Sequence, residues 1–401
     1  MTSTLAVVGG TYREQCEEPR VQRLCGSGLR ATQILRGLGH EVRFVTCIDD
    51  HLRPEFDAVT AALPGVDVAA SPRTGPIGFT YDTPVHSTNR GGTANADPVT
   101  AAADVVVAFG MVEKTEWTVQ TQWAVIDPQH APLPDLLRNV TAAHVAVVLN
   151  EHEVRTQAND DDLDAAAQFV LGLGVHVVVI KQGARGGLVV TSAGTATFGA
   201  CPTEVVDPIG SGDAFTAGFA HSWAIEHNPP EQAAQDASRV AAAHSLTGVA
   251  GFSASALDAV PEPIEYVPGP GPQVYLAGPF FNIAQRQLIT LIRTALTQLG
   301  VEVFSPLHEI GRGGDEVAEQ DLAGLRDSSS VLAVLDGADA GTLFEVGWAT
   351  GAGIPVVGLA EHHQDHAWTM VRGTGSAVVP DLSSAVYRAA WAALSTSTAA
   401  P

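Results

Sequence analysis

Short runs of β-branched residues alternate with longer, alanine-rich stretches along most of the chain. The short runs predict strands, and the longer stretches, whose apolar residues recur every three to four positions, predict amphipathic helices. This alternation is typical of a mostly parallel sheet covered by helices, so the pattern predicts an α/β protein. The strands expected in the first 260 residues are 4–8, 42–47, 104–108, 123–126, 144–149, 175–180 and 187–191.

A proline-rich segment interrupts this pattern. Residues 261–272 read PEPIEYVPGPGP, and proline is excluded from helix interiors and central strands. The segment is either a linker or a surface loop inside one large domain. The alternation restarts after it, which favours a linker. We therefore predict an N-terminal domain over 1–258, a linker over 259–272 and a second domain over 273–396.

The second domain opens with an expected strand at 274–278. A helix should follow, because apolar residues recur at helical spacing up to Leu299, and Gly300 lies where a helix would end. Further strands are expected at 301–304, 330–335 and 355–359, with a closing helix near 382–394. This arrangement predicts a compact open parallel sheet.

Composition narrows the class of protein. The chain has 401 residues, of which 45% are hydrophobic, and a formal net charge of -23. That length and apolar content suit two globular domains, and the negative charge argues against nucleic-acid polymers and anionic membranes as partners. The four cysteines are scattered, and we see neither a basic leader nor an apolar run long enough to cross a membrane. We expect a cytoplasmic protein that acts on small molecules.

The first candidate site is the segment Asp207-Pro-Ile-Gly-Ser-Gly-Asp-Ala-Phe215. We expect it to connect a strand at 203–206 with a helix at 213–225. Small residues at a helix start let backbone amides converge on a phosphate, so Gly210, Ser211 and Gly212 are candidates to bind one. Asp213 could then accept a proton from an attacking hydroxyl. The alternative is that Asp213 merely caps the helix.

The segment resembles the signature of the ribokinase-like (PfkB) family of carbohydrate and nucleoside kinases. Other segments resemble that family in the same order, over roughly residues 4–255. They are residues 23–45, Asp127-Pro128, the Asn150-x-x-Glu153 pattern and residues 178–190.

The resemblance implies a ribokinase-like α/β sandwich and a phosphotransferase activity. ATP would be the phosphoryl donor, Mg²⁺ would lie near Asn150 and Glu153, and the nucleotide would lie near Gly183 and Gly186. Lys181 is not assigned to the site, because a lysine at a strand end is more often solvated.

Two departures from the family pattern fall on the side of the phosphoryl acceptor. Gly9-Gly10-Thr11-Tyr12 stands where the family has an acidic residue, and Leu29-Arg30-Ala31 stands where it has an asparagine. We therefore expect the phosphoryl chemistry to be retained and the acceptor to be changed or lost. A catalytically silent kinase fold remains open.

The second candidate site is Asp336-Gly-Ala-Asp-Ala-Gly-Thr-Leu-Phe-Glu345-Val-Gly347, directly after an expected strand. Open α/β sheets bind ligands at this end of their strands. Glu345, placed in the first helical turn, would be kept ionised by the helix dipole, as a nucleophile requires. The alternative is a structural capping box formed by Thr342 and Glu345.

This segment resembles the nucleoside 2-deoxyribosyltransferase family, which includes nucleotide N-glycosidases. Tyr275-Leu-Ala-Gly-Pro-Phe-Phe281 and Gln320-Asp321 resemble other motifs of that family, over roughly residues 273–394. The resemblance implies a flavodoxin-like open parallel sheet, with Glu345 attacking the anomeric carbon and Tyr275 orienting it. It also implies a set of nucleoside-binding residues, namely Gly278, Phe280, Asp321, Asp336, Gly341 and Thr342.

Three further features of the C-terminal domain bear on its ligands and its assembly. The loop Ile310-Gly-Arg-Gly-Gly314 either binds a 5′-phosphate or is simply solvated. His362, His363 and His366 cluster in the sequence, and we assign no metal to them. Residues 370–376 lie where the deoxyribosyltransferase family often sends residues into a neighbouring subunit, so we expect a homo-oligomer.

Together these features predict a bifunctional enzyme of nucleoside or nucleotide metabolism. It would phosphorylate a sugar or nucleoside hydroxyl and would cleave or exchange an N-glycosidic bond. One alternative is that only the C-terminal N-glycosidase or transferase is active and that the kinase-like half is a nucleotide-binding scaffold. The other alternative is a sensor whose two halves bind nucleotides without catalysing a reaction.

Overall fold

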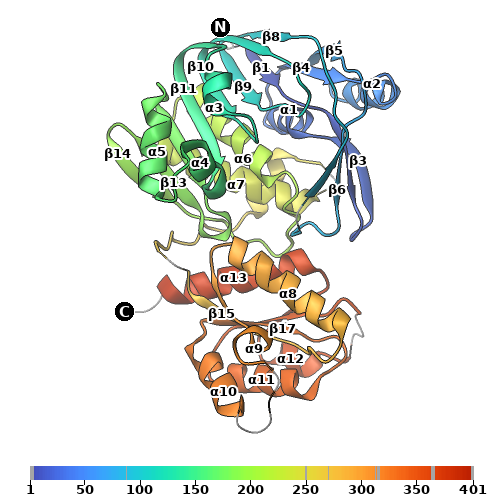
Figure 1. Cartoon of the computed structure of the whole chain (residues 1–401), viewed down its shortest axis with the longest axis vertical. Coiled ribbons are helices and arrows are strands. Elements are labelled where there is room, and N and C mark those ends of the chain that lie inside the picture. Colours follow the sequence, from blue (N-terminus) through green and yellow to red (C-terminus); the bar gives the residue numbers. More distant parts are fainter. Residues whose placement is uncertain are drawn as a thin grey trace. The chain divides into compact units, whose positions relative to one another are not determined.

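The computed structural model describes residues 4–398, apart from residues 87, 249–250, 270, 312, 314–316 and 363–365. The chain forms two compact units (Figure 1). The N-terminal unit consists of Met1–Gln182, Gly186–Cys201 and Asp207–Val260. The C-terminal unit consists of Gly183–Arg185, Pro202–Val206 and Pro261–Pro401.

The N-terminal unit is built on one large sheet. All its strand pairs are parallel except β12–β13 and β13–β14. Its strands follow the order β14 (Gly194–Phe198), β13 (Gly187–Thr191), β12 (Val177–Lys181), β11 (Val140–Asn150), β10 (Trp117–Asp127), β9 (Val105–Phe109), β1 (Leu5–Val8), β4 (Val42–Ile48) and β5 (Val66–Pro72), and β8 (Val99–Ala102) pairs with β10.

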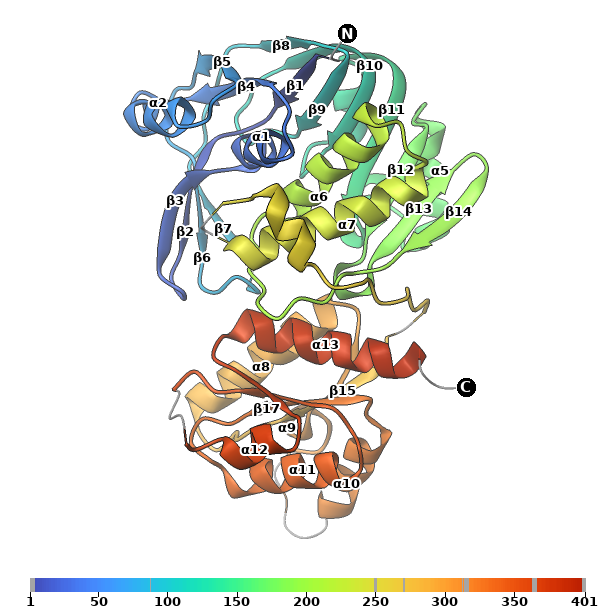
Figure 2. The same ribbon diagram turned by 180° about the vertical axis from the view of Figure 1, so that it is seen from behind.

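Helices cover both faces of this sheet (Figures 1 and 2). One face packs against α1 (Ser27–Gly37), α2 (Arg53–Ala61), α6 (Ser211–Phe219) and α7 (Pro230–Thr247). The other face packs against α3 (Leu133–Leu137), α4 (Glu151–Ala158) and α5 (Leu163–Gly172). The central strands are buried on both faces, which explains why their sequences are nearly continuous apolar runs. The predicted α/β sandwich is confirmed.

A second, four-stranded sheet was not predicted. Its order is β3 (Val21–Cys25), β2 (Tyr12–Cys16), β6 (Gly78–Tyr81) and β7 (Thr88–Gly91). These strands are short and partly polar, and every residue of β7 is exposed, so they lack the apolar signal that marks a buried strand.

Two expected elements around the glycine turn differ from the structure. The strand predicted at 203–206 is absent, and these residues form an irregular connection between Pro202 and Pro208, which have no backbone N–H for a ladder. The helix predicted at 213–225 begins two residues earlier, at Ser211. Its α-helical part ends at Phe219 and continues as a π-helical segment, η2 (Ala220–Ile225). Short 3-10 segments occur at η1 (Gly183–Arg185) and η4 (Ala254–Ala259).

The C-terminal unit contains a five-stranded sheet in which every pair is parallel. Its order is β16 (Glu302–Phe304), β15 (Gln273–Ala277), β17 (Ser330–Val334), β18 (Val356–Leu359) and β19 (Ala377–Val379). Numbered within the unit, this is the 2-1-3-4-5 order of flavodoxin-like sheets. The predicted open parallel sheet is therefore confirmed.

Helices cover both faces of this sheet as well (Figure 2). The helix predicted after the first strand is α8 (Ile283–Gln298), and it buries Ile289, Ile292, Ala295 and Leu296. It shares one face with α13 (Leu382–Thr398). The other face carries α10 (Ala318–Asp327), α11 (Ala340–Gly351) and α12 (Thr369–Gly373), and α9 (Pro306–Glu309) follows β16.

The described residues of 261–272 form neither helix nor strand. Within the part of the chain that the structure describes, we find no helix with the length and apolar character required to cross a bilayer.

Candidate active sites

The glycine turn of the N-terminal unit opens helix α6. Gly210 precedes the helix with a φ of 80°, a backbone conformation that favours glycine. A Cβ at this position would also lie 2.0 Å from Nε of Arg30. The helix begins at Ser211, so Asp213 lies inside the first turn and is not the cap. The Ser211 amide donates to the Pro208 carbonyl at 3.0 Å, so the amides of Gly212 and Asp213 are the ones in the first turn that remain available to an anion.

Asp213 is buried and forms a short ion pair. Its Oδ2 accepts a hydrogen bond from Nη1 of Arg30 at 2.6 Å, while its Oδ1 lies 3.3 Å from Nε2 of Gln129. Nη2 of Arg30 in turn donates to both carboxylate oxygens of Glu14, at 2.6 and 2.9 Å. Burial raises the pKa of Asp213 above its ordinary value, and the charge of Arg30 opposes part of that rise.

Lys181, which the sequence does not assign to the site, lines the same cavity as Asp213. Its Nζ donates to Oδ2 of Asp127 at 3.3 Å and would lie 3.2 Å from a Cβ at Gly212. Burial acts to lower the pKa of Lys181, but the carboxylates of Asp127, Glu153 and Asp213 raise it overall. The lysine ends strand β12, and its position beside the glycine turn could be seen only once the strand order was known.

Asn150 and Glu153 form the capping box of helix α4. The side chain of Asn150 accepts from the Glu153 amide at 2.8 Å, and Glu153 accepts from the Asn150 amide at 2.7 Å. Burial and the nearby charge of Asp127 raise the pKa of Glu153 to about 7, against the opposing effect of Lys181. The two residues therefore have a structural role in starting α4. One carboxylate oxygen of Glu153 takes no part in the capping box.

These groups line one cavity of about 370 Å³. The turn contributes Gly210, Gly212 and Asp213, the small sheet contributes aromatic side chains, and loops after β9 and β10 complete the wall. Gly183 and Gly186 are not among the described residues that line it. Gly186 instead has a φ of 91°, and a Cβ there would lie 2.1 Å from the Phe198 carbonyl oxygen, so the turn before β13 requires a glycine.

In the C-terminal unit, Tyr275 and Glu345 meet beside the parallel sheet. Tyr275 lies on β15 and its hydroxyl donates to Oε1 of Glu345, on α11, at 2.7 Å. Burial raises the pKa of Glu345 to about 7, because the hydrogen bond from Tyr275 offsets only part of the cost of a buried charge. The nearby carboxylates of Asp321 and Asp339 add to the rise.

The local setting of Glu345 corrects two expectations. Asp339 is the N-cap of α11 and accepts hydrogen bonds from the amide and hydroxyl of Thr342, at 2.9 and 3.0 Å. The helix therefore starts earlier than a cap at Thr342 would require, and the capping box of Thr342 with Glu345, the structural alternative, does not form. Glu345 consequently lies in the second turn and not the first, so the dipole acts on it weakly and does not keep its pKa low.

Asp321 lies on α10 close to this pair. Its Oδ1 is buried and has no hydrogen-bond partner among the described residues. Burial raises the pKa of Asp321, and the side chain contributes to the raised pKa values of both Tyr275 and Glu345. A buried carboxylate oxygen without a partner is costly, so this atom is suited to receive a donor from a ligand.

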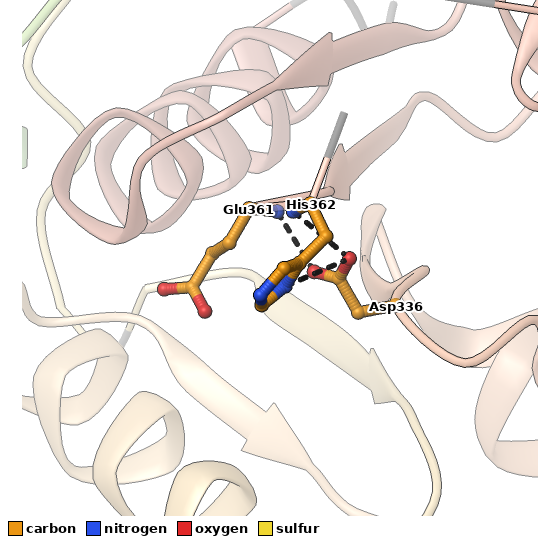
Figure 3. A group of neighbouring side chains, drawn as sticks. All are labelled: Asp336, Glu361 and His362. Atoms are coloured by element: carbon orange, nitrogen blue, oxygen red, sulfur yellow. Dashed lines mark hydrogen bonds and ion pairs between the residues drawn. The ribbon is translucent and has the colours of Figure 1, made fainter. Parts of the chain in front are cut away.

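Asp336 follows β17 and is committed to the backbone of another loop. Its two oxygens accept from the amides of Glu361, at 2.7 Å, and His362, at 3.1 Å (Figure 3). The carboxylates of Asp336 and Glu361 and a ring nitrogen of His362 lie within 4.8 Å of one another, and we assign no metal to them. Contact of Asp336 with a substrate stays a prediction.

The remaining predicted residues lie at or near the same edge of the sheet. Gly278 and Phe280 follow β15, while Gly341 and Thr342 begin α11. Thr342 is buried, and its side chain is engaged by Asp339. Arg312 and Gly314 of the proposed phosphate loop, and His363 of the histidine cluster, lie outside the described residues.

The fold and the two sites thus define a chain with a ribokinase-like α/β unit and a flavodoxin-like unit. Residues 113–255 match the family model described as pfkB family carbohydrate kinase. Residues 274–383 match the model described as nucleoside 2-deoxyribosyltransferase. Both resemblances predicted from the sequence are confirmed, and the chain contains a PfkB kinase domain and a deoxyribosyltransferase-like domain.

Individual relatives are similar to part of the chain. The cytidine kinase of Thermococcus kodakarensis is 39% identical over 88 residues, which are 21% of this chain and 31% of that protein. The chain therefore matches about a third of this curated relative's length. Among solved structures, a fructokinase from Vibrio cholerae in its fructose, ADP and calcium ion bound form has a TM-score of 0.51 at 15% identity, covering 65% of this chain and 99% of that one. An aminoimidazole riboside kinase from Salmonella enterica has a TM-score of 0.48 at 16% identity, covering 63% and 96%.

Proposed function

We propose that the chain is a bifunctional enzyme of nucleoside or nucleotide metabolism. The C-terminal unit cleaves or exchanges an N-glycosidic bond, and the N-terminal unit phosphorylates a hydroxyl of a sugar or nucleoside. The observation that carries the proposal most directly is the hydrogen bond from Tyr275 to Glu345 beside a parallel sheet. The two matching family models supply the classes of reaction.

In the C-terminal unit, the carboxylate of Glu345 is the nucleophile. One oxygen is held by Tyr275, which leaves the other to attack the anomeric carbon of the sugar. The bond from that carbon to the base breaks, the base takes up a proton, and a glycosyl ester forms on Glu345. Water or a second base then attacks the same carbon and releases the carboxylate. Because the two attacks come from opposite faces of the sugar, the configuration at the anomeric carbon is retained.

Trapping the ester tests this assignment. The protein is mixed with deoxynucleosides and their monophosphates, quenched in acid within the first turnovers, and digested for peptide mass spectrometry. We expect the mass of one sugar residue on the peptide that contains Glu345. The variant Glu345→Gln should carry no adduct and release no base, while Glu319→Gln, which changes an exposed carboxylate of α10, should behave like the wild type. Base release by Glu345→Gln at the wild-type rate would exclude Glu345 as the nucleophile.

In the N-terminal unit, the residues fit ATP and Mg²⁺. The glycine turn presents the amides of Gly212 and Asp213 near the cationic side chains of Arg30 and Lys181, an arrangement that suits a phosphate. Glu153 and Asp127 offer carboxylate oxygens, which are the ligands that Mg²⁺ prefers. Bound ATP would supply the phosphoryl group and Mg²⁺ would offset its charge. Asp213 takes the proton of the acceptor hydroxyl, and the turn amides stabilise the transferring group.

The relatives support a class of acceptor. The matching family model is one of carbohydrate kinases, and the curated relative is a cytidine kinase. We therefore propose a ribose or deoxyribose hydroxyl, free or in a nucleoside. ADP formation is measured across a panel of pentoses and nucleosides. Turnover should vanish in Asp213→Asn and persist in Glu231→Gln, which changes an exposed carboxylate at the start of α7.

A second candidate keeps only the C-terminal activity. The observation in its favour is the ion pair that occupies Oδ2 of Asp213, since Arg30 stands beside the proposed base. In that case the N-terminal unit is a scaffold or sensor that binds nucleotide without turning it over. Tight ATP binding without ADP formation from any member of the panel would favour the scaffold over the kinase.

A further inference from the structure

The acceptor side of the N-terminal cavity contains a buried network of charges. Arg30, on α1, bridges Asp213 of α6 and Glu14 of β2, and the side chains of Arg30 and Glu14 are 4% and 7% exposed. Glu14 also accepts from the Gly26 amide at 3.1 Å and from Nε of Arg23 at 3.0 Å. The network therefore connects the small sheet with the first turn of α6.

The network makes the two oxygens of Asp213 unequal. Oδ2 receives a charge-assisted hydrogen bond from Arg30 at 2.6 Å, whereas Oδ1 has only a long contact of 3.3 Å with the amide of Gln129. A hydroxyl that approaches Asp213 can displace the long contact far more easily than the short one. Oδ1 is thus the oxygen left to accept a proton, and both Asp213 and its neighbour Gln129 line the cavity.

We propose that Arg30 is a positioning residue for the base of the kinase reaction. It holds Asp213 by Oδ2, keeps the carboxylate ionised, and restricts the acceptor hydroxyl to the Oδ1 side. This inference rests on the proposed kinase function of the N-terminal unit.

The charges balance through the transfer step. The acceptor oxygen forms a bond to the phosphorus of a nucleoside triphosphate, and the bond from that phosphorus to the leaving nucleoside diphosphate breaks. The hydroxyl proton moves to Oδ1 of Asp213, which becomes neutral. Arg30 then retains Glu14 as its partner, so the step does not leave a buried guanidinium uncompensated. The proton leaves to solvent before the next turnover.

The first test compares two arginines that share Glu14. Arg30→Gln removes the contact with Asp213, while Arg23→Gln removes a partner of Glu14 only. A carboxyl group beside an arginine has its pKa lowered by about 1–3. In Arg30→Gln, the acid limb of kcat/KM for ADP formation should therefore move to a pH higher by a similar amount. Arg30→Lys should restore part of the difference, and Arg23→Gln should keep the wild-type limb. An unmoved acid limb in Arg30→Gln would overturn the proposal.

A second measurement does not depend on turnover. Protein labelled with ¹³C at aspartate carboxyls is titrated by NMR, with the Asp213 signal assigned from Asp213→Asn. The pKa of Asp213 should be higher in Arg30→Gln than in the wild type and in Arg23→Gln. Equal pKa values in all three proteins would refute the role of Arg30. Absence of ADP formation in a wild type that shows the difference would instead refute the proposed kinase function.

Discussion

Glu345 combines a raised pKa with a hydrogen bond that favours its ionised form. Burial raises its pKa to about 7, and the hydroxyl of Tyr275 opposes the rise. A nucleophile must be ionised, so base release should fall as the pH drops through about 7 and should level off above it. In Tyr275→Phe the opposing hydrogen bond is gone, and the acid limb should move to higher pH. The measurement is kcat for base release between pH 5 and pH 9.

The control for this prediction is Tyr387→Phe, which removes a hydroxyl from α13 on the opposite face of the sheet. It should leave the acid limb where the wild type has it. A limb in Tyr275→Phe that matches the wild type, or moves to lower pH, would contradict the assigned effect of Tyr275 on Glu345.

The two glycines of the phosphate turn should differ in their tolerance of a methyl group. A Cβ at Gly210 would lie 2.0 Å from Nε of Arg30, on a backbone with positive φ. A Cβ at Gly212 would lie 3.2 Å from Nζ of Lys181, a less severe approach and to the end of a long side chain. Gly210→Ala should therefore abolish ADP formation, whereas Gly212→Ala should retain part of it. Equal activity of the two variants would show that the turn does not hold Arg30 against Gly210.

At the scale of single elements, the cap of α11 determines where Glu345 lies. Asp339 caps the helix through Thr342, and loss of an N-cap costs about 0.5–2 kcal/mol. Asp339→Ala should lower the unfolding free energy of the C-terminal unit by about that amount. Asp327→Ala, at the exposed end of α10, should change it little. Chemical denaturation monitored by tryptophan fluorescence measures both, and equal stability of the two variants would argue against the cap.

The sequence predicts best the elements that are buried, because burial requires a regular pattern of apolar residues. Strands such as β1, β9 and β12 are buried along their length, so their β-branched runs mark them without ambiguity. The four-stranded sheet is not predicted, because its strands are short and polar. They are strands only by virtue of their hydrogen bonds to one another, which a local sequence pattern does not reveal. The start of α11 was misplaced because Asp339 and Thr342 are both good N-cap residues.

Within the sites, a motif predicts the site residues that it contains. It does not predict the side chains that distant segments of the chain contribute to the same site. The turn at Gly210 and the acid at Asp213 belong to one contiguous motif, so both could be proposed from the sequence. Arg30 stood out only as a departure from a family pattern, and its pairing with Asp213 spans 183 residues. The sequence does not predict Lys181 as a site residue, because a lysine at the end of a strand is more often exposed to solvent. Only the packing of β12 beside β11 and the turn determines its burial.

At the scale of the whole molecule, each unit contains its own candidate base or nucleophile. Asp213 and its partners belong to the N-terminal unit, and Glu345 and Tyr275 belong to the C-terminal unit. Neither set of hydrogen bonds includes a residue of the other. We therefore expect each activity to be removable by substitution without loss of the other.

One product analysis tests this central claim most directly. The wild type, Asp213→Asn and Glu345→Gln are each incubated with a mixture of nucleosides, nucleotides and pentoses, with and without ATP and Mg²⁺, and the products are identified by mass spectrometry. We expect Asp213→Asn to release free base but to form no phosphorylated product. Glu345→Gln should form phosphorylated product but release no base. Both products from either variant, or neither product from the wild type, would contradict an enzyme with two separate chemistries.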